Sequence, residues 1–234
     1  MENQRSLLIF FASVAPEGIS EKRTRERIKD YSRSLEIISR YAKKLNFDVH
    51  VVENTLGSLS NWISLDLHVE KDIAFSFFLE NSGRTNKGIG ELDMAQYVLS
   101  QLDVAIYKKV IWFSGRHILT SEGILKLCLS TPAEIVVSNP DFYFIDGDVV
   151  ETEKEGMFND MMFAMSSNAF VEYISVYNSA RANLIRKNLG SEQHLYQFVT
   201  TNTYSIEWMI QIGVLRRENK VKWRWFETSQ WHFC

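Results

Sequence analysis

The order of apolar runs and helical patterns constrains the fold of this chain more than any other feature. A continuous apolar run, SLLIFFASV at 6–14, is followed by a helical pattern that Ser20 can cap and whose apolar residues recur every three or four positions from Ile28 to Leu45. Further strand patterns lie at 48–55, 72–80 and 108–117, and a helical pattern precedes the last of them at 92–102. This alternation predicts an α/β protein with an open, mostly parallel sheet flanked by helices.

The second half of the chain predicts shorter strands in a more antiparallel or irregular arrangement. Its strand patterns lie at 134–138, 142–145 and 161–165, and its helical patterns lie at 168–187 and 191–199. Residues 56–69, in the first half, fit neither pattern clearly. The sequence has only three prolines and no proline-rich linker, so we expect 1–234 to form one domain.

Composition narrows the class of protein. Hydrophobic residues make up 45% of the chain, and no window approaches the roughly 18 consecutive apolar residues of a membrane span. The net charge of −3 argues against a dedicated nucleic-acid-binding protein. Cys128 and Cys234 have no metal-ligand spacing, and the first apolar run lacks the strongly basic flank of a signal peptide. We therefore expect a cytoplasmic protein.

Polar residues follow the predicted parallel strands at the point where each strand ends. Ser13 and Glu17 come after the first strand, and Asn54 comes at the end of the second. Open α/β sheets bind ligands at the carboxyl ends of their strands. These three side chains are therefore candidates for a ligand site.

The segment NSGRTNKGIGE at 81–91 lies between a strand pattern and a helical pattern, and contains three glycines, Arg84 and Lys87. Free backbone N–H groups at the start of a helix, together with two cations, attract an anion such as a phosphate group. The spacing matches neither the P-loop nor the G-x-G-x-x-G motif. A solvated connecting turn uses the same residue types, so both interpretations stay open.

The order of this loop, a helix, an apolar strand and a polar turn resembles the nucleotide-sugar half of the GT-A fold glycosyltransferases. In that family an N-G-x-x-x-A-R-N-x-G stretch precedes a helix, and the next strand ends in a D-x-D motif that holds Mn²⁺ or Mg²⁺. The chain is especially similar to bacterial and viral surface-polysaccharide transferases, whose equivalent strand ends in a K-x-x-G-R-Y type turn. The matching positions are Asn81, Gly83, Asn86, Lys87, Gly88 and Glu91 in the loop, and Ser114, Gly115, Arg116 and His117 in the turn.

The resemblance, which covers about residues 6–200, implies a GT-A-like, Rossmann-type sheet with a nucleotide-sugar half at about 1–118 and an acceptor half at about 119–234. It implies transfer of a sugar from a nucleotide-diphosphate sugar donor to a glycan or lipid-linked glycan acceptor in the biosynthesis of a capsule or lipopolysaccharide. The residues expected to bind the donor are Ser13, Glu17, Asn54, Asn81, Gly83, Arg84, Asn86, Lys87 and Gly88.

The chain departs from the family at the metal-binding motif. Ser114, Gly115 and Arg116 stand where the family usually has two metal-binding aspartates. A diphosphate leaving group needs positive charge as the glycosidic bond breaks, and a guanidinium group can supply it in place of a metal ion. We predict that Arg116, helped by Lys87 or Arg84, replaces the metal, so that no cofactor is required. The alternative is that Arg116 only forms an ion pair with a neighbouring carboxylate.

A rival metal site lies at Asp146 and Asp148, in the segment FIDGDVVETE. Paired carboxylates suit Mg²⁺ or Mn²⁺, and a Mg²⁺-dependent nucleotidyltransferase would use them. Asp-Gly between two apolar runs is also a strong hairpin signal, and the turn is the preferred interpretation. A further alternative is a non-catalytic module that binds carbohydrate or a membrane surface, because the six tryptophans suit stacking on sugars.

Two carboxylates of the second half are candidates for acceptor chemistry. Inverting GT-A transferases often carry an acidic pair at a helix N-terminus, and Glu192-Gln193, followed by His194, stands at the equivalent place. Glu192 is therefore the candidate general base, although it also complements the helix dipole. Asp160 is a candidate for binding acceptor hydroxyls, with a strand-flanking role as the alternative.

The segment at 216–225 combines cations with tryptophans. Clustered cations beside interfacial tryptophans favour contact with an anionic membrane surface, which would place the protein at the inner face of the membrane. Alternating charged and apolar residues are also typical of an amphipathic terminal strand. The residues concerned are Arg216, Arg217, Lys220, Lys222, Trp223, Arg224 and Trp225.

Overall fold

The computed structural model describes residues 5–79, 82–138, 142–145, 148–151, 158, 160–209, 214–217 and 223–227. These residues form a mixed α/β fold with a seven-stranded sheet, a five-stranded sheet and flanking helices. The predicted fold class is confirmed.

The larger sheet places the parallel strands of the first half side by side. Its order is β10-β6-β9-β4-β1-β2-β3. The strands are β1 (Leu7–Ala12), β2 (Asp48–Glu53), β3 (Ile73–Phe77), β4 (Lys109–Ser114), β6 (Ile135–Ser138), β9 (Met162–Ser166) and β10 (Ile206–Met209). Strands β1 to β4 are parallel, whereas β9 runs antiparallel to both β4 and β6. The carboxyl ends of β1, β2 and β4 therefore meet at one edge.

Continuous apolar sequence explains the two central strands. Every residue of β1 and β4 is buried, as expected for strands that are covered on both faces. Trp112 of β4 packs between Phe11 and Phe163, with ring centroids 4.0 and 5.0 Å apart. Neighbouring strands of the sheet are thus tied together by aromatic contacts beneath the edge where β1 and β4 end.

Helix α1 (Glu21–Leu45) follows the predicted pattern. Its Ser20 cap accepts a hydrogen bond from the Arg23 backbone N–H, and the helix ends at Asn46 in the left-handed region with φ of 56°. Tyr31, Leu35 and Ile38 of the predicted stripe are buried. Burial of this stripe fixes α1 alongside the strands that carry the candidate ligand site.

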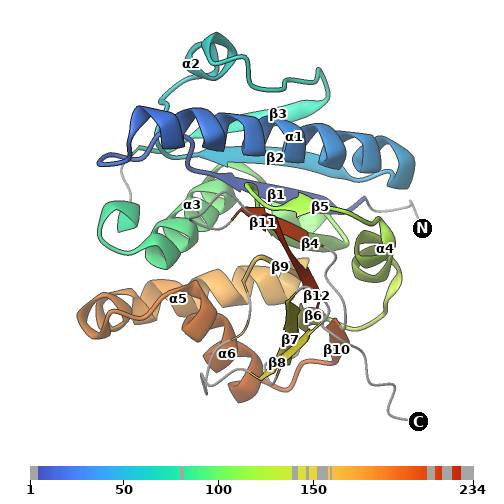
Figure 1. Ribbon diagram of the computed structural model, residues 1–234. Helices are drawn as coiled ribbons and strands as arrows, with labels where there is room; N and C mark the ends of the chain where they lie inside the picture. Colours follow the sequence, from blue (N-terminus) through green and yellow to red (C-terminus); the bar gives the residue numbers. More distant parts are fainter. Residues whose placement is uncertain are drawn as a thin grey trace.

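The other helices are α2 (Leu59–Ser64), α3 (Lys87–Gln101), α4 (Gly123–Ser130), α5 (Ser167–Lys187) and α6 (Ser191–Thr201), with short 3-10 turns η1 (Ser82–Arg84) and η2 (Val104–Ile106). Figure 1 shows α1 and α2 at one end of the molecule and α5 and α6 at the other.

Helix α3 packs against both α5 and α6. Its buried Asp93 accepts hydrogen bonds from Tyr177 Oη at 2.5 Å and Arg181 Nε at 2.8 Å, both on α5. Helix α2 lies within the unclear segment 56–69, and the sequence patterns did not predict α4.

The smaller sheet is antiparallel and contains the terminal segment. Its strands are β5 (Ile118–Leu119), β7 (Phe142–Ile145), β8 (Asp148–Glu151), β11 (Val214–Arg217) and β12 (Trp223–Glu227), in the order β5-β11-β12-β7-β8. The strand interpretation of the tail is thus confirmed for 214–217 and 223–227. Leu215 pairs with Ile118, so the tail lies beside the turn that follows β4.

Candidate functional site

A cleft of about 170 Å³ opens at the carboxyl edge of the larger sheet. Residues from the ends of β1, β2 and β4 line it, together with residues from the start of α3. Five of the predicted site residues are among them, namely Ser13, Asn54, Gly83, Lys87 and Arg116. The volume is below the roughly 300–1,000 Å³ of a complete small-molecule pocket. It therefore suits one anionic part of a ligand better than a whole nucleotide sugar.

The charges that line the cleft are mostly positive. Arg27, Lys87 and Arg116 are cations, and Glu91 is the carboxylate among the described lining residues. Lys87 Nζ lies 2.9 Å from Glu91 Oε1. Burial lowers the pKa of Lys87, but the charges of Glu91 and Asp160 outweigh it and hold that pKa above the ordinary value. Lys87 is therefore a stable cation, and the cleft as a whole favours an anion.

The turn after β4 fixes the position of Arg116. Gly115 donates its backbone N–H to the Phe11 carbonyl at 2.9 Å, and a Cβ at this position would lie 2.2 Å from the Phe10 ring. Ser34 of α1 donates its hydroxyl to the His117 carbonyl at 2.6 Å. Only glycine fits between β4 and the aromatic ring, so the chain turns there and brings the next residue, Arg116, to the cleft.

Arg116 makes no ion pair with any carboxylate in the part of the chain that the structure describes. The alternative interpretation of Arg116, as one half of a structural ion pair, thus gains no support there. A guanidinium group that lines a cleft and has no carboxylate partner there can form bidentate hydrogen bonds with a phosphate group.

Asn86 and Gly88 connect the start of α3 to the turn between α5 and α6. Asn86 caps α3 by accepting the Ile89 N–H at 3.2 Å, and its amide group donates to the Leu189 carbonyl at 3.1 Å. A Cβ on Gly88 would lie 2.4 Å from the Ser191 backbone nitrogen. These two loop residues therefore hold the N-termini of α3 and α6 together and do not line the cleft.

The remaining predicted loop residues lie outside the cleft lining. Arg84 Nη2 pairs with Glu17 Oε1 at 2.6 Å, and both side chains are largely exposed. This contact joins the segment after β1 to η1. Asn81 lies outside the described residues.

Three residues that the sequence analysis did not name as site candidates shape the loops after β1 and β2. Tyr31 Oη accepts the Ser13 N–H at 3.0 Å, and Arg27 Nε donates to the Ser13 carbonyl at 2.9 Å. Glu53, fully buried at the end of β2, accepts hydrogen bonds from the backbone N–H groups of Val14 at 3.0 Å and Thr55 at 2.7 Å. A polar residue predicted inside a buried strand is the signal that could have identified Glu53.

The second-half candidates, Asp160 and Glu192, lie near the same elements. Asp160 is buried and accepts a hydrogen bond from the Ser191 hydroxyl. The Ser114 N–H donates to the Met161 carbonyl at 2.9 Å, which places Asp160 next to the end of β4. Glu192 follows Ser191 in the first turn of α6 and is partly exposed. His194, by contrast, is buried and stacks on Tyr173 with ring centroids 4.7 Å apart, and burial lowers its pKa.

The residues at the end of β4 do not fit a divalent metal ion. Ser114, Gly115 and Arg116 offer one hydroxyl and a cation where paired carboxylates would be needed, and no group of three or more metal-ligating side chains occurs among the described residues. For the rival pair, Asp146 lies outside those residues and the side chain of Asp148 is not described. Ile145 pairs with Asp148 across antiparallel strands β7 and β8, which favours the hairpin interpretation.

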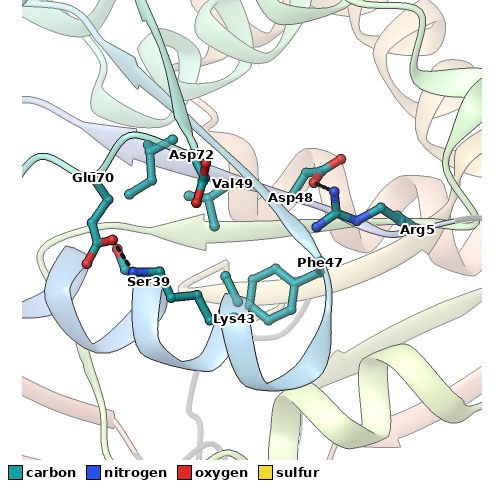
Figure 2. A pocket seen from close by; sticks show the side chains of 10 residues that line it. Arg5, Ser39, Lys43, Phe47, Asp48, Val49, Glu70 and Asp72 are labelled. Carbon is teal, nitrogen blue, oxygen red and sulfur yellow. Dashed lines mark hydrogen bonds and ion pairs between the residues drawn. The ribbon is translucent and has the colours of Figure 1, made fainter.

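A second depression of about 360 Å³ lies at the opposite edge of the sheet, between α1 and the starts of β1, β2 and β3. Figure 2 shows two ion pairs that span it: Lys43 with Glu70, and Arg5 Nη1 with Asp48 Oδ1 at 2.6 Å. Both ion pairs neutralise the cations of this depression, whereas in the carboxyl-edge cleft Lys87 alone of the three lining cations is paired with a described carboxylate. None of the described residues predicted for the site lines this depression, so the smaller cleft is the better candidate.

This arrangement is the GT-A fold of the nucleotide-sugar glycosyltransferases, as the resemblance implied. One similar solved structure is a proposed nucleotide-diphospho-sugar transferase from Desulfovibrio desulfuricans G20, with a TM-score of 0.52 and 10% identity over 86% of this chain and 78% of the other. Another is the galactosyltransferase LgtC in complex with donor and acceptor sugar analogues, with a TM-score of 0.53 and 9% identity over 86% and 72% of the two chains. An active-site variant of LgtC matches equally well, with a TM-score of 0.52.

These similarities show the fold alone. No protein-family model and no curated protein sequence matches the chain. Within the described residues, no helix combines the length and the apolar character that crossing a membrane requires.

Proposed function

We propose that the chain is a glycosyltransferase that transfers a sugar from a nucleotide-diphosphate sugar to a glycan acceptor. The observation that carries this proposal is the position of Lys87 and Arg116, which line one cleft at the carboxyl edge of a GT-A sheet. Open α/β sheets bind ligands at this edge. LgtC, which shares the fold, binds donor and acceptor sugar analogues.

In the proposed reaction, the cleft holds the pyrophosphate group of the donor. Negative charge develops on this leaving group as the glycosidic bond breaks, and fixed cations that face it lower the barrier. Arg116 would contact two phosphate oxygens through its planar fork, and Lys87 would act as a point charge at the positive end of the α3 dipole. Because no carboxylate pair ends β4, we propose that transfer proceeds without a metal cofactor.

The acceptor side of the proposal involves the two carboxylates beside α6. Glu192 is the proposed general base that takes the proton of the attacking hydroxyl, and Asp160 is proposed to bind acceptor hydroxyls. The acceptor would be a glycan or lipid-linked glycan of a surface polysaccharide. The basic and aromatic tail at 216–225 would then contact the inner face of the membrane that carries such an acceptor.

The alternative functions gain less support. A nucleotidyltransferase would need Asp146 and Asp148 as metal ligands, and the pairing of Ile145 with Asp148 favours a turn at this place. A non-catalytic module would not need both Lys87 and Arg116 in one cleft, with Arg116 lacking an ion pair among the described carboxylates. We therefore propose sugar transfer as the function.

A thermal-shift screen in EDTA tests the proposal. A ligand present at about 100 times its Kd stabilises the folded state by about 2.7 kcal/mol, which raises the Tm of a domain of this size by about 5–10 °C. We expect such a shift with one nucleoside diphosphate, or its sugar, among the UDP, GDP, dTDP and CDP series. The absence of any shift, or a shift seen only after Mn²⁺ is added, would contradict the metal-free donor site.

A further inference from the structure

The cleft contains a buried carboxylate that has no role in the proposed reaction. Glu91 lies one helical turn after Lys87 on α3, and its side chain is only 7% exposed. Oε1 forms the ion pair with Lys87 Nζ at 2.9 Å. Oε2 is buried and has no hydrogen-bond partner among the described residues, although the residue lines the cleft.

A buried carboxylate oxygen without a partner is unfavourable, because it has lost water and gained no hydrogen bond in exchange. Burial accordingly raises the pKa of Glu91, although the charge of Lys87 opposes this shift. Completion of its hydrogen bonds by a ligand is one reason for a folded protein to keep such a group. A ligand group that donates a hydrogen bond in the cleft would complete them.

We propose that Glu91 selects the donor sugar by accepting, at Oε2, a hydrogen bond from a hydroxyl group of that sugar. The inference rests on the proposed function and adds to it the kind of sugar that the site takes. Glu91 acts on the sugar, whereas Arg116 and Lys87 act on the pyrophosphate.

The ion pair indicates which hydroxyl groups are within reach. If the Lys87 ammonium contacts a phosphate oxygen at about 2.8 Å and Glu91 at 2.9 Å, the carboxylate lies within about 6 Å of the pyrophosphate. In a sugar joined to the pyrophosphate through C1, the hydroxyls nearest to it are those on C2 and C3. The accepted donor should therefore carry a free hydroxyl on C2 or C3.

Titration calorimetry with matched ligand pairs tests this proposal. Each pair consists of a nucleoside diphosphate and a corresponding nucleotide sugar: UDP with UDP-glucose, UDP-galactose or UDP-N-acetylglucosamine, GDP with GDP-mannose, and dTDP with dTDP-glucose. Glu91→Met removes the acceptor oxygens and should weaken binding of the sugar-bearing ligand by about tenfold or more. Binding of the diphosphate alone should stay within about twofold or become tighter, because Lys87 is released from its carboxylate.

Two further variants control for structure. Glu91→Gln keeps the shape of the side chain and one acceptor oxygen, so it should fold even if Glu91→Met does not, and should show a smaller loss in the same direction. Glu36→Gln removes an exposed carboxylate on α1, which pairs with Arg40, and should change neither affinity. If the Glu91 variants weaken the diphosphate and its sugar equally, Glu91 only positions Lys87 and the specificity proposal is overturned.

Removal of the hydroxyl from the ligand gives the complementary test. The 2-deoxy or the 3-deoxy analogue of the bound sugar nucleotide should bind wild-type protein about tenfold more weakly than the parent does. The Glu91→Met variant should bind parent and analogue with the same affinity, because the losses from removing two groups that contact each other do not add. Equal losses in both proteins overturn the proposal. If wild-type protein binds a diphosphate but binds no nucleotide sugar more tightly than the corresponding diphosphate, the specificity proposal is overturned, while the pyrophosphate cleft stands. If the wild type binds no ligand of any pair, the proposed function fails and this inference fails with it.

Discussion

Replacing Arg116 with alanine should lower kcat by about 10²–10³-fold, the loss that follows removal of one preorganised group that stabilises developing charge. Arg116 lines the cleft and pairs with no described carboxylate, so its positive charge is available to the leaving pyrophosphate. Arg116→Lys should restore part of the rate, because an ammonium supplies charge without the bidentate fork. Steady-state kinetics with the nucleotide sugar found in the screen gives the measurement.

Arg40→Ala is the matched control for this prediction. Arg40 lies on α1 and pairs at 3.9 Å with Glu36 one turn away, with its side chain 66% exposed. This variant loses the same charge away from the cleft and should keep full activity. A similar rate for Arg116→Ala and Arg40→Ala would show that Arg116 has no part in the reaction.

Glu192→Gln should lower the rate of acceptor-dependent transfer by about 10²–10⁴-fold, the usual contribution of a general base. Slow hydrolysis of the donor without acceptor should change less, because attacking water can lose its proton to other water molecules and the pyrophosphate contacts are intact. The two rates, measured on the same preparation, separate a loss of the base from a loss of donor binding.

Asp160→Asn provides the comparison for Glu192. Asp160 is buried and accepts the Ser191 hydroxyl, so its replacement should lower the Tm as well as the rate, whereas Glu192 is partly exposed and its replacement should leave the Tm near that of the wild type. A Glu192→Gln variant with an unchanged transfer rate would exclude Glu192 as the base. The reaction would then either use Asp160 or retain the configuration of the sugar, which needs no such base.

The sequence predicted the central part of the fold because that part depends on hydrophobic pattern alone. Strands β1 and β4 are buried on both faces and therefore appear as continuous apolar runs. Helix α1 shows its buried stripe in the spacing of Tyr31, Leu35 and Ile38. Helices α2 and α4 were missed because a helix of six or eight residues is too short to show a clear period.

The candidate site was predictable only where topology determines it. Ser13, Asn54 and Arg116 follow parallel strands, and the rule that such strands end at one edge brings them together. Asn86 and Gly88 have partners about 100 positions further along the chain, at Leu189 and Ser191. Contacts of that range leave no local pattern, so the sequence offered phosphate binding or a solvated turn for this loop and could not predict that Asn86 and Gly88 pack two helix ends together.

A crystal structure of the protein with the nucleoside diphosphate identified in the screen, prepared in EDTA, would show directly whether the carboxyl-edge cleft is a metal-free pyrophosphate site. We expect diphosphate oxygens within hydrogen-bond distance of the Arg116 guanidinium and the Lys87 ammonium, in the cleft at the ends of β1 and β4. A diphosphate that binds elsewhere, or one held by a divalent ion on Asp146 and Asp148 with Arg116 directed away from it, would show that the cleft is not a metal-free pyrophosphate site.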